Sequence, residues 1–209
     1  MPYRTVCISR DLGAGGEEVG RRAAEQLGFR YVDEEIVARA AAKGDLDPAA
    51  VADAEQRQPL VRRLLDAIAE GSIASPEAAT YVPQLLLEPG ARESVGVLIR
   101  AAVRETAEQG GAVIVAHAGS HTLDNRDDVL RVLVTGSDDR RAGRLTEETS
   151  MTGAEVRQAL RESEKARADY LKRFHGIARE RPTDYDLVLN TDALGLERAA
   201  GVVVAAARS

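Results

Sequence analysis

The sequence predicts an α/β fold in which a five-stranded parallel sheet carries helices on both faces. Two observations lead to this prediction. Apolar runs of strand length alternate along the 209-residue chain with segments of helical periodicity, which is the pattern of parallel strands joined by helices. The run Ala112 to Ala116 is apolar at every position, as expected for an interior strand covered on both faces. Ligands of such folds bind at the C-terminal ends of the strands.

The composition limits the classes of partner. Hydrophobic residues make up 44% and charged residues 30% of the chain, which fits a single globular domain over 1–209 with a core of its own. Aromatic residues make up only 3%, which argues against binding single-stranded nucleic acid through stacked bases. The net charge of −6 opposes non-specific contact with nucleic acid, and no apolar stretch is long enough to cross a bilayer. We therefore expect neither a nucleic-acid polymer nor a membrane as partner.

The cellular compartment is inferred from the cysteine and the first residues. The single cysteine, Cys7, lies in an apolar run and is interpreted as a buried, inert thiol. The first residues lead directly into that run without the pattern of a signal peptide. We expect a cytoplasmic protein with a reduced thiol.

Glycines and apolar residues divide the first part of the chain. The expected elements are a strand over 5–9, a glycine-dense turn over 10–16, a helix over 17–27, a strand over 29–32 and a helix from 33 to 44. Gly28 and Gly44 stand where helices commonly end. A helix then opens at Asp47-Pro48, and the leucine-rich stretch from Gln56 to Pro89 is interrupted by glycine and proline. We interpret residues 45–90 as a helical insertion in the single domain.

The second part continues the alternation. The expected elements are a helix over 91–109, strands over 112–116 and 129–135, helices opening at Ser137 and Thr152, a strand over 185–190 and a helix over 197–207. Ser137 is a typical N-cap residue of the helix that carries Arg140 and Arg144. Thr152 and Glu155 have the spacing of a capping box, and the helix behind them extends to about Phe174.

The glycine-dense turn is the strongest functional signal. Glycine lets the backbone approach an anion, and the following helix N-terminus supplies unpaired N–H groups and partial positive charge. Measured against G-x-x-x-x-G-K-[ST], however, Gly16 and Glu17 occupy the lysine and Ser/Thr positions and Arg10 replaces the first glycine. Measured against G-x-G-x-x-G, Glu18 replaces the third glycine. A plain tight turn therefore stays open as an alternative, although the position between strand and helix, with Ser9 and Arg10 able to face an anion, favours phosphate.

Several segments together resemble one known family. They are Ile8-Ser9-Arg10-Asp11-Leu12-Gly13-Ala14-Gly15-Gly16, Tyr31-Val32-Asp33-Glu34-Glu35-Ile36, Val113-Ile114-Val115, Arg131-Val132-Leu133-Val134, Glu164-Lys165-Ala166-Arg167-Ala168-Asp169-Tyr170 and Tyr185-Asp186-Leu187-Val188-Leu189-Asn190-Thr191. The chain resembles the cytidylate kinase-like family, with its S-R-x-x-G-S-G-G loop and L-G-x-x-Y-x-D-x-E-I segment, over most of its length outside roughly 56–90. The resemblance implies a three-layer P-loop NTPase-like fold with a helical lid or insertion. It also implies phosphoryl transfer from ATP, with Mg²⁺, to a nucleoside monophosphate or a similar small acceptor.

The resemblance also assigns roles to individual residues. The donor phosphates would bind the loop residues Ser9, Arg10, Gly13, Ala14, Gly15 and Gly16. Asp33 matches an acidic residue near the acceptor, and His117 stands where the family typically has the arginine of a Gly-Arg-Gly segment. In a lid-like region at about 140–182, the catalytic cations would be Lys165, Arg167, Arg140 and Arg144. Arginine forks suit phosphate oxygens.

Other interpretations stay open at this point. The missing lysine, the missing Ser/Thr and the change to His117 are also compatible with a non-catalytic nucleotide-binding or regulatory relative. The lid arginines could form a solvated helix face. A dinucleotide-dependent oxidoreductase is opposed by Glu18, and a metal site at His117 and His121 lacks a third ligand. The leucines of 56–89 permit either an acceptor lid or a homodimer contact.

Overall fold

The computed structural model describes residues 3–44, 91–116 and 118–209. The expected insertion at 45–90 and the acceptor-side residue His117 therefore lie outside the described residues. In the described ranges, no helix has the length and apolar character needed to traverse a bilayer.

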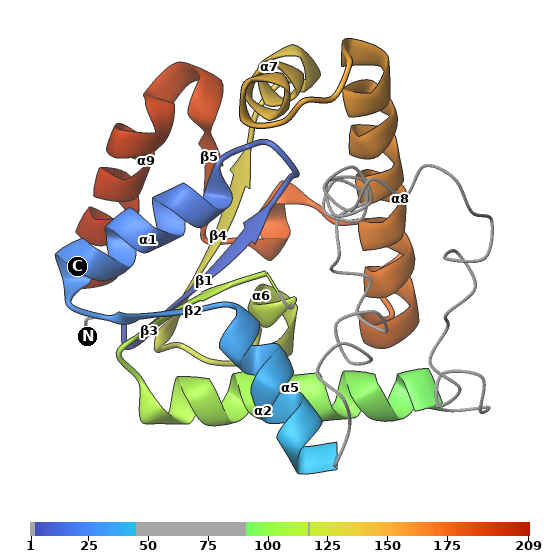
Figure 1. Cartoon of the computed structure of the whole chain (residues 1–209). Helices are drawn as coiled ribbons and strands as arrows, with labels where there is room; N and C mark the ends of the chain where they lie inside the picture. The colour runs from blue at the N-terminus through green and yellow to red at the C-terminus, as the bar shows by residue number, and fades with distance from the viewer. Residues whose placement is uncertain (1–2, 45–90, 117) are drawn as a thin grey trace.

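Five parallel strands form one sheet, as the sequence predicts. They are β1 (Thr5–Arg10), β2 (Arg30–Val32), β3 (Ala112–Val115), β4 (Val129–Thr135) and β5 (Leu187–Asn190), in the order β2-β3-β1-β4-β5. Ile8 of the central strand lies opposite Val115 on one side and Val132 on the other. The end of β1, where Ser9 and Arg10 lead into the glycine turn, is therefore flanked by the ends of β3 and β4 (Figure 1).

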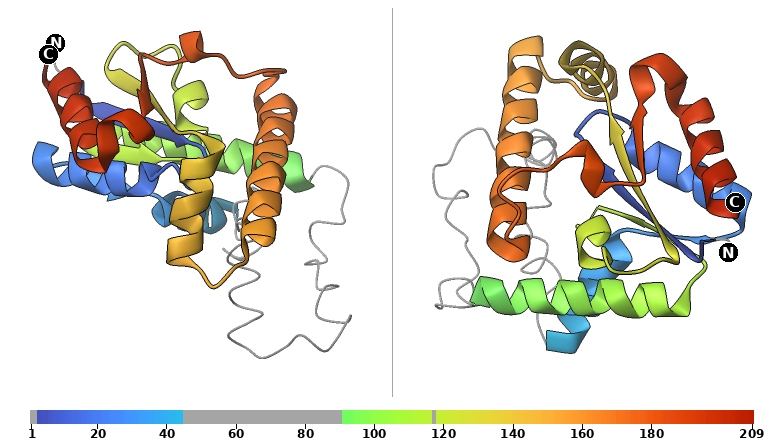
Figure 2. Two further views of the ribbon diagram at one scale, coloured as in Figure 1. Left: turned by 90° about the horizontal axis from the view of Figure 1, so that it is seen from above. Right: turned by 180° about the vertical axis from the view of Figure 1, so that it is seen from behind.

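Helices cover both faces of this sheet (Figures 1 and 2). The helices are α1 (Gly16–Leu27), α2 (Glu34–Gly44), α5 (Ala91–Gln109), α6 (Gly119–Thr122), α7 (Asp138–Glu148), α8 (Gly153–His175) and α9 (Thr191–Arg208), with a 3₁₀ turn η3 (Pro182–Asp184). Alternate residues of β1 enter different cores: Val6 and Ile8 pack with α1 and α9, and Cys7 packs with α2 and α5. Successive strand side chains point to opposite faces, so the three-layer prediction is confirmed.

Helices α7 and α8 form a separate pair beyond the C-terminal edge of the sheet. Their contact is a small apolar cluster in which Leu145 of α7 packs with Met151, Val156 and Leu160. Thr152 accepts the N–H of Glu155 while the Glu155 carboxylate accepts the N–H of Thr152, which confirms the predicted capping box. At its other end α8 meets α5, where Arg100 donates to the carbonyl oxygen of Phe174 at 3.2 Å (Figure 2).

Some element boundaries differ from the sequence-based expectation. The last helix begins at Thr191 rather than at 197, because the Asn190 side chain caps it by accepting the N–H of Asp192. Gly195, with φ of 69° and ψ of 167°, is not helical and divides this helix at a kink. The last strand begins at Leu187 rather than Tyr185. Helix α6 and η3 were not predicted, since segments of three or four residues carry no helical periodicity.

Candidate phosphate-binding site

The glycine turn runs from the end of β1 to the N-terminus of α1. Gly13 and Gly15 have φ of 75° and 78°, a left-handed conformation that other residues adopt only with strain. A Cβ at Gly13 would also lie 2.6 Å from the carbonyl oxygen of Arg141, and one at Gly16 would lie 2.5 Å from Cβ of Arg10. These glycines are thus required by backbone conformation and by close packing. Gly15 caps α1 without a side chain, so the first N–H groups of the helix depend on another partner, such as an anion.

Arg10 lies at the mouth of this turn and is already paired. Its guanidinium contacts the carboxylate of Glu17, in the first turn of α1; the two side chains are 21% and 37% exposed. The residue at the Ser/Thr position of the motif therefore neutralises the arginine that the sequence analysis assigned to phosphate. Since half-exposed ion pairs contribute little free energy, an incoming phosphate can compete with Glu17 for Arg10.

The opposite side of the turn is held by two residues from distant elements. Arg144 of α7 donates from Nη1 to the carbonyl oxygen of Gly13 at 3.1 Å and to Oγ1 of Thr191 at 3.0 Å. Thr191 is only 1% exposed, and its Oγ1 lies 2.9 Å from the carbonyl oxygen of Ala14 and 3.2 Å from that of Thr135. Its single proton is shared between these two acceptors, of which Ala14 is the nearer. Sequence reasoning named Arg144 as a cation for the transferred group and did not single out Thr191.

A second arginine of α7 was missed by the sequence analysis. Arg141 is 3% exposed; it binds Asp138 at 2.7 Å, Glu164 of α8 at 2.5 Å and the carbonyl oxygen of Leu12 at 3.4 Å. It thereby joins α7, α8 and the turn. The signal was the spacing, because Arg141 and Leu145 are four residues apart and share the buried face of the helix.

A pocket of about 180 Å³ lies between the turn and the second half of α8. Its lining combines charged groups with small apolar ones: Asp11, Glu164, Arg167, Ala168, Leu171, Ile177, Ala178, Arg179 and Glu180. Asp11 belongs to the glycine turn and accepts a hydrogen bond from Oγ1 of Thr135 at 2.6 Å. The pocket therefore brings Arg167, a predicted lid cation, to the same space as the turn.

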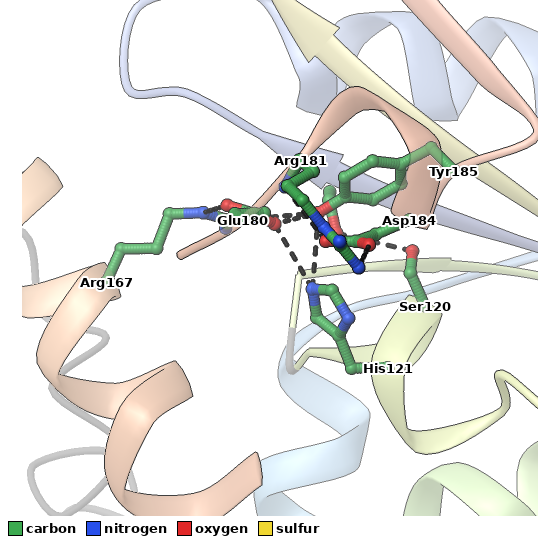
Figure 3. A network of polar contacts seen from close by, with 8 residues as sticks. Ser120, His121, Arg167, Glu180, Arg181, Asp184 and Tyr185 are labelled. Carbon is green, nitrogen blue, oxygen red and sulfur yellow. Dashed lines mark hydrogen bonds and ion pairs between the residues drawn. The ribbon is translucent and has the colours of Figure 1, made fainter. Parts of the chain in front are cut away.

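Glu180 is the centre of a polar network on the lid side of this pocket (Figure 3). Arg167 donates to its two carboxylate oxygens at 2.9 and 2.6 Å, and Nε2 of His121 lies 3.2 Å away. The Tyr185 hydroxyl also donates to it. Burial, the largest effect, would raise the pKa of Glu180, but the hydrogen bonds from His121 and Arg167 and their charges together lower that pKa to about 2. Glu180 is thus ionised at neutral pH and neutralises Arg167.

His175, the last residue of α8, lies behind His121 with 6.2 Å between ring centroids. Burial, together with the positive charges of His121 and Arg100, lowers the pKa of His175 to about 4. The imidazole is therefore neutral at physiological pH.

The remaining predicted residues lie in different surroundings. Ser9 is buried, with its Oγ 3.3 Å from Oγ of Ser120. Asp33 lies at the end of β2 and accepts a hydrogen bond from the Tyr31 hydroxyl at 3.3 Å. Arg140 and Lys165 are exposed, and their side chains form no hydrogen bond or ion pair with the residues that the structure describes.

Comparison with known proteins identifies the family of the chain. A family model described as "Cytidylate kinase-like family" matches residues 5–193. A cytidylate kinase of Rhodococcus opacus (strain B4) is 29% identical over 94% of this chain and 91% of its own length. A cytidylate kinase of Desulfitobacterium hafniense (strain Y51) is 26% identical over 92% of this chain and 87% of its own length.

Solved structures reveal the same architecture at low sequence identity. An uncharacterized protein from Eubacterium ventriosum superposes with a TM-score of 0.65 at 14% identity, covering 96% of each chain. A shikimate kinase from Bacteroides thetaiotaomicron gives a TM-score of 0.51 at 13% identity over 95% of each chain. At these identities the likeness concerns the fold alone.

Proposed function

The chain belongs to the cytidylate kinase-like family, and from this premise we propose that it transfers the γ-phosphoryl group of ATP to a nucleoside monophosphate. Family and fold are those of a nucleotide kinase; the donor, the acceptor and the residue roles are the proposal. The observation that carries it is the glycine turn between β1 and α1. No side chain caps the helix behind this turn, and the turn residue Asp11 lines the same pocket as Arg167.

The donor phosphates are assigned to the glycine turn. The N–H groups of Gly15, Gly16 and the first turn of α1 supply hydrogen bonds that no capping side chain uses. Arg10 supplies the side-chain charge once its guanidinium exchanges Glu17 for a phosphate oxygen. Ser9 and Ala14 are buried in the walls of the turn and give it shape.

The residues beside the turn also fit Mg²⁺. Asp11 presents a carboxylate to the pocket, and Mg²⁺ in kinases is held by one or two carboxylates together with phosphate and water oxygens. The described residues contain no group of three or more metal-ligating side chains, as this mode of binding requires none. Asp11 would hold the ion, which would supply neutralising charge to the phosphates.

The transfer itself needs positioned cations on the lid-like region at about 140–182. An oxygen of the acceptor phosphate attacks the γ-phosphorus, the bond to the β–γ bridging oxygen breaks, and ADP leaves. Arg167 releases Glu180 and stabilises the charge on the transferred group, while the exposed Lys165 and Arg140 approach when the region closes. Asp33 and His117 are assigned to the acceptor side.

The proposal is tested by a coupled ADP-release assay with ATP, Mg²⁺ and a panel of nucleoside monophosphates, together with calorimetric ATP binding. We expect turnover with at least one acceptor. Arg167→Gln should lower kcat at least tenfold with ATP affinity little changed, and Arg198→Gln, an exposed change on α9, should leave both as in the wild type. ATP binding without turnover would contradict the enzyme and leave a binding protein; absence of ATP binding would contradict both.

A further inference from the structure

The glycine turn lacks the lysine that ordinarily orders such loops, yet its two central carbonyl groups have fixed partners. Arg144 binds the Gly13 carbonyl and Thr191 binds the Ala14 carbonyl. Arg144 and Thr191 are also bonded to each other, at 3.0 Å between Nη1 and Oγ1 and 3.4 Å between Nη2 and the Thr191 carbonyl. Through this contact, α7, which carries Arg144, and the start of α9, which carries Thr191, meet on one side of the turn.

Fixing a carbonyl group also fixes the N–H group of the same peptide. In a trans peptide the C=O and N–H bonds point in opposite directions, and the described chain has no cis peptide. The bond from Thr191 to the Ala14 carbonyl therefore aims the N–H of Gly15 away from α9. This N–H is one of those that cap an anion at the start of α1.

Arg144 differs from the three paired arginines around the turn in the charge of its hydrogen-bond partners. Arg10, Arg141 and Arg167 each contact at least one carboxylate. In the part of the chain that the structure describes, Arg144 makes hydrogen bonds only to neutral groups and forms no ion pair. Its charge also acts on Asp192, whose pKa is lowered chiefly by the hydrogen bonds from Ser137 and further by Arg144. On the turn, a charged donor strengthens the hydrogen bond to the Gly13 carbonyl and polarises the peptide that accepts it.

We propose that Arg144 and Thr191 are positioning residues, which hold the Gly13–Gly15 peptides in the anion-binding conformation and replace part of the ordering and charge of the missing lysine. The anion-binding role rests on the proposed function. Arg144 does not reach the transferred group in this assignment; it acts through the backbone of the turn.

The test combines a measurement that needs no ligand with one that does. Amide hydrogen exchange of peptides covering 11–16, and calorimetric binding of ATP with Mg²⁺ at a temperature well below melting, are compared for Arg144→Gln, Arg144→Lys, Thr191→Val and Thr191→Ser. Thr191→Val keeps the shape and removes the hydroxyl, and Thr191→Ser restores it. The matched controls are Arg198→Gln, exposed on α9, and Thr146→Val, whose hydroxyl bonds only within α7 to Ala142.

We expect Arg144→Gln and Thr191→Val to raise exchange in the turn about tenfold and to weaken ATP binding about tenfold. Thr191→Ser should recover both, Arg144→Lys part of each, and the controls should match the wild type. Equal ATP affinity and equal exchange in wild type, Arg144→Gln and Thr191→Val would overturn the inference. A loss of ATP affinity and of exchange protection in Thr191→Ser as large as in Thr191→Val would also overturn it.

The two proposals fail differently. If the wild type binds no ATP, the proposed function falls and exchange alone decides the inference: faster exchange in Arg144→Gln and Thr191→Val supports it, and unchanged exchange overturns it. If those variants melt below the working temperature, Arg144→Lys is compared with the wild type by the same two measurements. A partial loss of exchange protection and of ATP affinity in Arg144→Lys then supports the inference, and the absence of both losses overturns it.

Discussion

Replacing Glu180 by glutamine tests the lid network most directly. The pKa of Glu180 falls from 4.5 to about 2 on folding, which corresponds to about 3 kcal/mol of stabilisation of the ionised form. The Glu180 side chain is only 20% exposed, so solvent screens its interaction with Arg167 only weakly. Glutamine keeps an acceptor for one bond but leaves Arg167 without its counter-charge. We expect the variant to lose about 2–3 kcal/mol of unfolding free energy at pH 7.

The sign of the pH dependence follows from the lowered pKa. A carboxylate with a folded pKa below its unfolded value stabilises fully above the unfolded value, here 4.5, and loses this contribution as the pH falls toward 2. Urea unfolding should therefore show that the difference in unfolding free energy between wild type and Glu180→Gln is less than half as large at pH 3 as at pH 7. Glu197→Gln, which removes a partner of Arg22 that is 75% exposed, is the control and should cost about 0.5 kcal/mol or less. Equal losses in the two variants at pH 7, or a gap that does not change with pH, would refute the reasoning.

Three further predictions concern the turn and the end of α8. Glu17→Gln releases Arg10 and removes a negative charge beside the phosphates, so calorimetry should show ATP binding about three- to tenfold tighter; unchanged or weaker binding would contradict the assigned competition. Gly13→Ala places a Cβ 2.6 Å from the Arg141 carbonyl oxygen at a positive φ, so urea unfolding should show a loss of about 2–4 kcal/mol of unfolding free energy. A loss below about 1 kcal/mol would contradict this expectation and show that the turn can relax. His175 has a folded pKa of about 4 against 6.5 unfolded, so the wild type should lose stability as the pH drops from 6.5 toward 4. His175→Gln should flatten this range, and an identical pH profile would exclude His175 as its source.

The sheet could be predicted because its residues are organised locally. The strands are rich in apolar and β-branched residues, with β3 apolar throughout, and Gly28 and Gly110 end the preceding helices with positive φ, as their sequence positions indicate. The start of α9 could not be predicted in the same way. Its cap depends on Asn190, which ends β5 as predicted and also caps the helix, and the segment behind it contains Gly195, which normally breaks a helical pattern.

The site was predictable only in part, because its contacts join residues far apart in the sequence. The turn at 10–16 could be located from its glycines and its place between strand and helix. Two of the ion pairs depend on how the chain folds back on itself. They are Arg10 with Glu17, and Arg167 with Glu180, which lies 13 positions further along the chain. No local pattern distinguishes Arg144, which binds the Gly13 carbonyl of the turn, from the exposed Arg140 on the same helix.

The pairing of cations with carboxylates inside the chain has a consequence for selectivity. Since Arg10 and Arg167 already hold Glu17 and Glu180, the proposed binding of a phosphate ligand would be an exchange of anions rather than the filling of a site with unpaired cations. Each ligand oxygen has to outcompete a carboxylate that is tethered to the protein and therefore present at a high effective concentration. A singly charged or poorly aligned anion gains too little to displace it, whereas a polyphosphate that engages the turn and the lid together displaces both. In the proposed assignment, the carboxylates of Glu17 and Glu180 thus compete with the ligand, and they favour ligands with enough charge and length to displace both.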